Sequence, residues 1–339
     1  MKQGTGEDPV RASREPVLSV GEGDSVRTAC ERIVVALGGN ALLRKGDRGT
    51  AAEQAARSVA AMDALAPLLT PERQVVITHG NGPIVGNILI RQQLARHVVP
   101  PMPLDVCGGE SQGNIGYLLE RALLQVLRQR GMCRPVATLL SLVEVDPHDP
   151  AFLHPTKPVG PFLSATEADE LGSSVPAARD ADRGFRRVVA SPVPTRIIES
   201  TAIAALLTAG VVVITLGGGG VPVASDGKGG LIGVEAVIDK DRSSSLLARE
   251  LGARSLIILT DIDHVYLDFL STRRQVVKRM TAAEAEEHWR HGEFLPGSMA
   301  PKVAAAIEFL RGGGQRVLIG LPEELPQLLR GEAGTELIP

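Results

Sequence analysis

Aromatic residues and an excess of positive charge are both lacking in this 339-residue sequence. Aromatics make up only 3% of the chain, so an extended surface that stacks nucleic-acid bases is not expected. The 36 basic and 39 acidic residues leave a net charge of −3, without the basic excess that polyanion binding requires. We therefore expect no nucleic-acid partner.

Cysteine and long apolar runs are also scarce. Cys30, Cys107 and Cys133 form an odd set without CxxC spacing, which argues against a disulfide framework and favours a reducing compartment. No apolar run reaches the roughly 18 residues of a membrane span, and the mixed-charge start lacks the apolar core of a secretory signal. We expect a cytoplasmic protein without membrane attachment, in which residues 1–31 form a flexible extension because they offer little apolar surface.

Glycine, in contrast, is abundant, with 37 residues in 339 against a usual ~7%. Three glycine clusters follow short apolar runs, at 38–40, 80–82 and 217–220. Glycine at the end of a buried strand lets the backbone approach a ligand, and a helix that follows directs free N–H groups toward an anion. One such loop is often only a tight turn, but three on successive strands predict an extended polyphosphate site.

The hydrophobic pattern alternates between strands and helices, which predicts an α/β fold. Apolar runs typical of strands lie at 32–37, 74–79, 134–145, 188–192, 210–215, 255–260 and 316–320, and helical stretches at 50–69, 85–97, 112–129 and 302–311. Such βαβ units form a mainly parallel sheet with helices on both faces, and ligands bind at the carboxyl ends of its strands. Within one domain spanning 32–339, the proline-rich stretch 146–187 is predicted to be a lid-like subdomain.

Standard phosphate-binding and metal motifs are missing. The P-loop pattern GxxxxGK[ST] fails because Gly229 follows Lys228 and Pro222 replaces the first glycine. The dinucleotide pattern GxGxxG fails at 80–86, where the last glycine comes one residue too late. His288 and His291 lack the glutamate of HExxH, so no dedicated metal ligands are expected.

Three lysines lie in apolar or glycine- and proline-rich surroundings: Lys157 in PTKPVGP, Lys240 in AVIDKD and Lys302 in GSMAPK. Phosphoryl transfer needs cations and backbone donors around the phosphoryl oxygens, which is what such lysines would supply. Lys302 is the strongest candidate, because Pro301 suits a first helical turn and would place the lysine at a positive helix end. The alternative for each is a plain surface position.

Acidic residues also lie near these segments, and two of them have more than one interpretation. Asp241 opens a helical stretch, where it is either an N-cap or a charged partner that orients Lys240. Asp261 ends a strand shortly before Tyr266, and this stretch lines a nucleotide pocket, helps to hold Mg²⁺ or is simply a polar turn. Asp105 borders a small-residue turn that would face the phosphoryl acceptor.

Nine segments of the chain, in order, resemble the carbamate kinases of the amino-acid-kinase superfamily. They are VALGGNALL (35–43), VITHGNGPIVG (76–86), PLDVCGGESQGNIGY (103–117), PTKPVGP (155–161), RRVVASPVP (186–194), LGGGGVPV (216–223), EAVIDKD (235–241), LTDIDHVY (259–266) and GSMAPKV (297–303). The resemblance implies a three-layer α/β/α sandwich with a protruding subdomain, and a homodimer. It also implies the reversible, Mg²⁺-dependent exchange of ATP and carbamate with ADP and carbamoyl phosphate, used catabolically to make ATP, with arginine breakdown among the possible sources.

The resemblance also implies roles for individual residues. The transferred phosphoryl group and the carbamate would be cradled by Gly38, Gly39, Asn40, Gly80, Asn81 and Gly82. Lys157 would reach in from the protruding subdomain, Lys240 and Lys302 would neutralise phosphate charge, and Asp241 would organise the lysines. The nucleotide would be held by Gly217, Gly218, Gly219, Asp261 and Tyr266.

Two positions depart from the family pattern. Ile84 stands where the family typically has glutamine, and Gly109-Glu110 replaces an Ala-Met pair. A carboxylate beside an anionic acceptor is unfavourable unless it points away or pairs with a cation. These departures keep open a kinase of the same fold acting on another small carboxylate or phosphate. A non-catalytic nucleotide-binding protein is a third hypothesis, and a dinucleotide oxidoreductase is the last.

Overall fold

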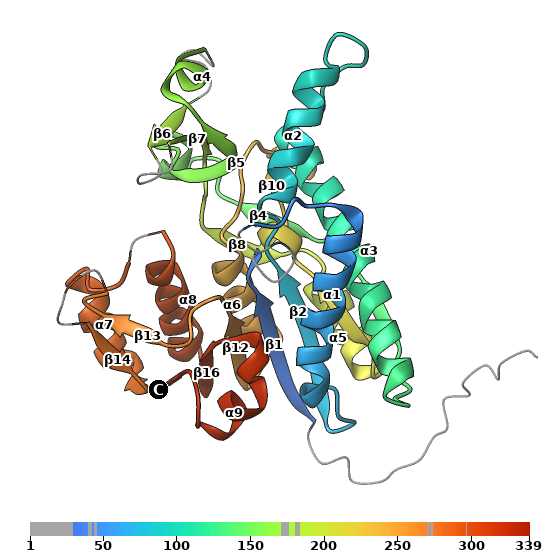
Figure 1. Ribbon diagram of the computed structural model, residues 1–339, viewed down its shortest axis with the longest axis vertical. Helices are drawn as coiled ribbons and strands as arrows, with labels where there is room; N and C mark the ends of the chain where they lie inside the picture. Colours follow the sequence, from blue (N-terminus) through green and yellow to red (C-terminus); the bar gives the residue numbers. More distant parts are fainter. Residues whose placement is uncertain are drawn as a thin grey trace, which may run out of the picture.

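A twisted, mainly parallel sheet forms the centre of the molecule (Figure 1). The computed structural model describes residues 30–39, 43, 46–170, 176–179, 184–269, 271, 274–295 and 297–339. Over these residues the sheet has eight strands in the order β15-β17-β16-β12-β1-β2-β9-β3. Their bounds are β1 (Glu31–Leu37), β2 (Arg73–His79), β3 (Val136–Thr138), β9 (Val212–Thr215), β12 (Ser255–Leu259), β15 (Arg279–Thr281), β16 (Arg316–Gly320) and β17 (Thr335–Ile338). In this part of the chain every neighbouring pair is parallel except β16 and β17.

Helices cover both faces of this sheet and bury one apolar core on each side. One core lies under α1 (Ala51–Leu65), α2 (Ile84–Ala95), α3 (Leu104–Gln129) and α9 (Leu325–Arg330). The other lies under α5 (Ser200–Thr208), α6 (Lys240–Glu250), α7 (Ala282–Arg290) and α8 (Met299–Arg311). Alternate residues of β1 divide between the cores, with Val35 in the first and Val34 in the second, which is why the strand sequence is apolar throughout. The predicted three-layer α/β/α sandwich is confirmed.

A second sheet of four strands, in the order β11-β10-β4-β8, contains the strands that follow β3 and β9 in the chain. We call the eight-stranded sheet, this sheet and the helices packed on them the body. The second sheet consists of β4 (Leu142–Val145), β8 (Pro194–Ile197), β10 (Val221–Ser225) and β11 (Leu231–Gly233). The prediction of one strand over 134–145 is therefore wrong, because that run divides between β3 and β4. The chain changes sheets at Ser141, whose backbone N–H and carbonyl are bonded to the side-chain amide of Gln112 on α3.

A small antiparallel sheet stands apart from the body in Figure 1, in the order β5-β7-β6. It is formed by β5 (Lys157–Leu163), β6 (Ala177–Arg179) and β7 (Phe185–Val189), with α4 (Ala165–Glu170) beside it. The apolar run 188–192 begins at the end of β7, where Val188 and Val189 are buried and Val189 belongs to the first core. We call these three strands the small sheet.

Helix α3 begins eight residues earlier than the sequence predicts, at Leu104 instead of Gln112. Asp105 therefore lies in the first helical turn and not in a small-residue loop. Of the glycines in this part of the helix, Gly108 and Gly113 leave open space for a Cβ. A Cβ at Gly109 would contact Leu140, and one at Gly116 would overlap the Thr138 side chain.

Shorter elements complete the described chain. They are the 3-10 turns η2 (Ala66–Leu68), η3 (Pro150–Phe152), η5 (Gly217–Gly219) and η6 (Pro322–Glu324), and the hairpin of β13 (Val265–Leu267) and β14 (Gln275–Val277). The apolar run 234–238 resembles a strand in the sequence. In the structure, its Ala236 forms an isolated β-bridge with Ala190. Among the described helices, none combines the length and apolarity needed to cross a membrane.

Candidate active site

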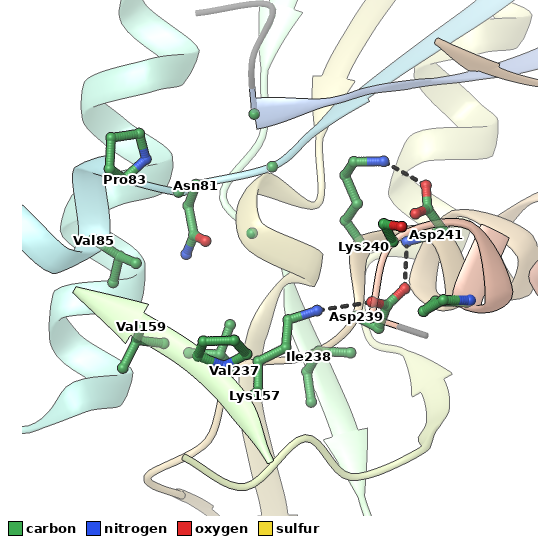
Figure 2. Close-up of a pocket in the computed structure, with 18 of the residues that line it drawn as sticks. Asn81, Pro83, Val85, Lys157, Val159, Val237, Ile238, Asp239, Lys240 and Asp241 are labelled. Carbon is green, nitrogen blue, oxygen red and sulfur yellow. Dashed lines mark hydrogen bonds and ion pairs between the residues drawn. The ribbon is translucent and has the colours of Figure 1, made fainter. Parts of the chain in front are cut away.

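A cavity of about 230 Å³ opens where the carboxyl ends of β1, β2 and β9 face the small sheet (Figure 2). Its walls come from the glycine loops, the small sheet and the starts of three helices. The residues that line it are Gly39, Gly80, Asn81, Gly82, Pro83, Val85, Lys157, Pro158, Val159, Gly160, Arg186, Gly218, Val237, Ile238, Asp239, Lys240, Asp241, Gly297, Ser298, Pro301 and Lys302.

The first turns of α2, α6 and α8 all border this cavity. Pro83 precedes α2, Asp239 caps α6, and Ser298 precedes α8. Unpaired N–H groups and the aligned peptide dipoles make the start of a helix attractive to anions. Among the residues that the structure describes, none hydrogen-bonds to the buried Oγ of Ser298. The cavity wall thus offers the hydroxyl of Ser298 and the positive ends of three helix dipoles.

A buried carboxylate shared by two lysines forms the base of the cavity. Lys240 donates a hydrogen bond to Oδ1 of Asp241, and Lys302 Nζ lies 3.0 Å from Oδ2 of the same carboxylate. Lys240 and Asp241 are consecutive at the start of α6, whereas Lys302 comes from α8. Pro301 lies in the first turn of α8, as its sequence context predicts. Contacts between α6 and α8 therefore bring together residues 61 positions apart.

The charges of this cluster depend on one another. Burial disfavours the Asp241 carboxylate, but the ammonium groups of Lys240 and Lys302 outweigh burial and hold its pKa well below the usual range. Burial also opposes the charge on Lys302, yet the attraction of Asp241 raises its pKa overall. Burial dominates at Lys240 and lowers its pKa, with the nearby Lys302 charge adding to this effect. Asp241 is thus firmly ionised.

Asp239 connects the start of α6 to the small sheet. Its Oδ1 accepts hydrogen bonds from the backbone N–H groups of Asp241 and Arg242, which caps the helix. Its Oδ2 accepts a hydrogen bond of 2.7 Å from Lys157 on β5. Although burial opposes its charge, the neighbouring Lys157 lowers the pKa of Asp239 overall. The N-cap interpretation of Asp241 is therefore wrong, since the cap lies two residues earlier.

Glycine is required where the strand-end loops touch. A Cβ on Gly39 would lie 2.7 Å from the carbonyl oxygen of Gly82, which joins the loops after β1 and β2. Gly218, in the loop after β9, has a φ of +66°, and a Cβ there would overlap the Asn81 amide. The loops can approach one another this closely only because they lack side chains at these positions.

The structure brings most of the predicted site residues together. Gly39, Gly80, Asn81, Gly82, Lys157, Gly218, Lys240, Asp241 and Lys302 all line the cavity. Gly38, Gly217 and Gly219 lie behind it, where Gly217 packs against His79 and the carbonyl of Gly219 accepts a hydrogen bond from Ser243. Asn40 lies outside the described residues.

The Asp261–Tyr266 stretch follows β12 and does not line this cavity. The Tyr266 hydroxyl donates to the carboxylate of Asp263, 2.9 Å away, and the guanidinium of Arg274 lies over the Tyr266 ring. Asp261 is close enough to Lys302 to favour the lysine's charge. This stretch therefore lies close to Lys302 of the lysine cluster.

The small sheet rests on α2 through apolar and glycine contacts. Val85 and Val159 are both buried, and a Cβ on Gly86 would overlap the backbone of Gly160. Arg186 on β7 lines the cavity and donates through Nε to the carbonyl of Gly160, 3.1 Å away. The sequence reasoning missed Arg186, Asp239 and Ser298. For Asp239 a signal existed, since it stands directly before the helical run and suits an N-cap.

The two departures from the family pattern do not face the cavity. Ile84 is buried in the core beneath α1 to α3. Glu110 is exposed on α3, with its carboxylate 3.5 Å from the amide nitrogen of Gln92. The added carboxylate is thus directed away from the lysines, and neither substitution changes the lining of the cavity.

His79 lies at the end of β2 and is buried. Its Nδ1 is 3.0 Å from the carbonyl of Gly80. Burial lowers the pKa of its imidazole to about 4, so the ring is neutral near pH 7. His79 is therefore a buried, hydrogen-bonded residue at a strand end.

The sequence and the fold are similar to those of known kinases. The model of the amino acid kinase family matches residues 31–320. "Carbamate kinase-like protein YahI" of Escherichia coli (strain K12) is 44% identical, and a carbamate kinase of Pyrococcus horikoshii is 42% identical, each over 91% of this chain and 99% of the relative. The structure of carbamate kinase from Giardia lamblia bound to AMP-PNP has a TM-score of 0.85 at 37% identity, covering 91% and 99% of the two chains. The chain therefore belongs to the amino acid kinase family and, within it, to the carbamate kinases.

Proposed function

We propose that this chain catalyses reversible phosphoryl transfer between ATP and carbamate, which yields ADP and carbamoyl phosphate. The observation that carries the proposal is the cavity itself, where Lys157, Lys240 and Lys302 converge with three helix N-termini. Such a wall suits a transferred phosphoryl group, whose charge spreads over three oxygens. The similarity to carbamate kinases, one of them solved with AMP-PNP, supports both substrates.

The paired lysines are the centre of the proposed mechanism. Lys240 and Lys302 share the Asp241 carboxylate, so together the three side chains carry one net positive charge in fixed positions. Cations that are held in place before the reaction stabilise developing charge without reorganisation in the transition state. The carbamate oxygen would attack the γ-phosphorus in line. No general base is needed, because the attacking oxygen of the carbamate anion carries no proton.

The small sheet would close over the acceptor and supply Lys157. Carbamate is small and unstable in water, so a site that encloses it must exclude solvent. Contacts of β5 with α2 and the pairing of Lys157 with Asp239 place the lysine in the cavity wall. We propose that Gly39, Gly80, Asn81 and Gly82 contact the phosphoryl group and the acceptor from the opposite wall.

The nucleotide would extend from the cavity past Gly218 toward Asp261 and Tyr266, next to Lys302. Among the described residues no group of three or more His, Cys, Asp or Glu side chains could hold a metal ion. This fits Mg²⁺, which often enters with phosphates and water and takes one or two carboxylates from the protein. Asp239 and Asp241, both ionised, are the cavity carboxylates that would hold its hydration shell. Bound Mg²⁺ would neutralise phosphate charge.

The direct test is ATP formation from ADP, Mg²⁺ and carbamoyl phosphate in a coupled assay. We expect rapid ATP production by the wild-type chain and its loss in Lys302→Ala. Lys278→Ala, which removes an exposed lysine outside the cavity, is the matched control. A folded, nucleotide-binding protein that forms no ATP would contradict the proposal. A screen of other small carboxylates and phosphates would then identify a different acceptor.

We also propose that two copies of this chain associate in the cytoplasm. Val106 and Tyr117 expose apolar surface on α3, and Leu140 and Ile232 do so nearby, beside the edge strand β3. The described cysteines are free thiols, as a reducing compartment permits. Light scattering after size exclusion should show a dimer, and Leu140→Asp should shift it to monomer. In this compartment the enzyme would form ATP from carbamoyl phosphate released by nitrogen catabolism, with arginine as one source.

A further inference from the structure

The side-chain amide of Asn81 is held in one orientation by a buried serine. Asn81 follows β2 and lines the cavity, and its Nδ2 lies 3.3 Å from Oγ of Ser111 on α3. Ser111 is completely buried, and its hydroxyl donates to the carbonyl of Gly108, 2.6 Å away. Because that bond uses the hydroxyl hydrogen, Ser111 presents a lone pair to Asn81. The nitrogen of the amide, and not its oxygen, must therefore face Ser111.

The oxygen of the same amide is left for the cavity. Figure 2 shows the Asn81 side chain pointing into the cavity, opposite Lys157 and Ile238. Within the described chain no hydrogen bond is made to its Oδ1, and this atom is not among the buried polar atoms without a partner. The ammonium groups of Lys157, Lys240 and Lys302 in the same wall are donors, whereas Oδ1 of Asn81 is an acceptor.

An acceptor in this position distinguishes between otherwise similar ligands. The oxygens of carbamate and of carbamoyl phosphate would accept hydrogen bonds from the lysines, whereas the amino group donates. Acetyl phosphate has almost the same shape as carbamoyl phosphate, but a methyl group replaces the amino group. A site that is built to bond an N–H discriminates against the analogue that lacks it, because its own polar atom is then left unpaired.

We propose that Ser111 is a positioning residue, which holds Asn81 with Oδ1 toward the amino group of the acceptor and thereby selects carbamate over methyl-bearing carboxylates. This inference rests on the proposed function, because it concerns the acceptor of the same reaction. Without Ser111 the amide would be free to turn its nitrogen toward the acceptor, and the preference for an amino group would decrease.

The experiment compares carbamoyl phosphate with acetyl phosphate in the ATP-forming direction. Selectivity is the ratio of the inhibition constant of acetyl phosphate to the KM for carbamoyl phosphate, which can be measured whether or not acetyl phosphate is a substrate. In Ser111→Ala we expect this ratio to fall about tenfold, through a higher KM for carbamoyl phosphate. Asn81→Ala should lower it at least as much, and the double variant should lower it no further than Asn81→Ala alone.

Ser58→Ala is the matched control, because Ser58 is equally buried and bonds the carbonyl of Gln54 on α1, away from the cavity. It should leave the selectivity at the wild-type value. An unchanged ratio in folded Ser111→Ala, an equal loss for both phosphates, or effects of Ser111→Ala and Asn81→Ala that multiply would each overturn the inference. Absence of ATP formation by the wild-type chain would instead refute the proposed function.

Discussion

The two sides of the cavity hold their charged groups in different ways. On the body, the side chains of Asp241, Lys240 and Lys302 are 4%, 11% and 15% exposed. At the small sheet, Lys157 and its partner Asp239 are 30% and 19% exposed. The first cluster lies in a low-dielectric setting where its charges interact strongly, and the second remains partly screened by water. The body thus provides fixed charge, and the small sheet provides charge that solvent can still reach.

The burial of strand residues also differs between the body and the small sheet. The last five residues of β1 and of β2 are buried, with helices on both faces. In the small sheet, two of the three residues of β6 are exposed, and burial in β7 is confined to its last two residues. Few buried apolar contacts are typical of elements that open at low free-energy cost. The body therefore holds the charged groups in fixed positions, whereas the small sheet is the part whose movement would give access to the cavity.

The largest effect is expected at the fixed cluster. Lys240→Ala and Lys302→Ala should each lower kcat roughly 10²–10³-fold, as the loss of a preorganised electrostatic donor does in other enzymes. The measurement is ATP formation at saturating substrates, after circular dichroism has shown that each variant is folded. Near-wild-type turnover in both variants would show that the body does not supply the essential charge.

A pH series tests the rigidity of the body through His79. The pKa of this buried imidazole is about 4 in the fold, against 6.5 for a free histidine. The unfolded chain binds the proton more tightly than the folded chain does. The contribution of His79 to the free energy of unfolding is therefore fully present above pH 6.5 and declines as the pH falls toward 4. The decline should reach about 3 kcal/mol. Urea unfolding between pH 4 and 7 measures it, and His79→Asn should flatten this dependence. An equally steep dependence in the variant would assign it to other groups.

A smaller effect is expected at the small sheet. Lys157→Ala should lower kcat/KM by about tenfold, because a partly exposed cation contributes roughly 1–2 kcal/mol to binding an anion. Steady-state kinetics with carbamoyl phosphate measure this. Lys228→Ala, at an exposed lysine in the β10–β11 hairpin, is the control and should have no effect. A loss as large as that of Lys302→Ala would remove the distinction between the two sides.

The contact between α2 and β5 offers the mildest test. Gly86→Ala places a Cβ against the backbone of Gly160 and should displace the small sheet from α2. We expect the KM for carbamoyl phosphate to rise several-fold, up to about tenfold, with little change in thermal stability, since roughly 1 kcal/mol of contact is lost. Gly113→Ala is the control, because a Cβ there meets open space on α3. An unchanged KM in Gly86→Ala would show that closure does not depend on this contact.

Local sequence signals predicted the central part of the fold well. The runs 32–37, 74–79 and 255–260 are mainly apolar, and each became a buried strand. Lys302 could be placed at a helix start because Pro301 signals a first turn. These features depend on residues close to one another in the sequence, where hydrophobic pattern and helix signals are informative.

Contacts between distant residues explain what the sequence did not reveal. Strands β3 and β4 are separate because Gln112 bonds the backbone of Ser141, 29 residues away. The start of α3 resembled a loop because it is rich in glycine, yet a Cβ would meet open space at Gly108 and Gly113, and close packing against Thr138 occurs farther along the helix, at Gly116. For the start of α6 the sequence left Asp241 as either a cap or a partner of Lys240. Its bond to Lys302 on α8, together with the cap at Asp239, shows that it is the partner.

The bond between Asp239 and Lys157 has a consequence for the ligand that enters the cavity. A phosphate that recruits Lys157 must displace a carboxylate that is already 2.7 Å from its ammonium group. The gain in affinity is then the difference between two ion pairs, not the full strength of one. Because the Asp239 carboxylate competes with either anion for Lys157, it weakens the binding of product as much as the binding of substrate. A reversible reaction requires that both the substrate anion and the product anion can dissociate, and this competition prevents either from binding too tightly.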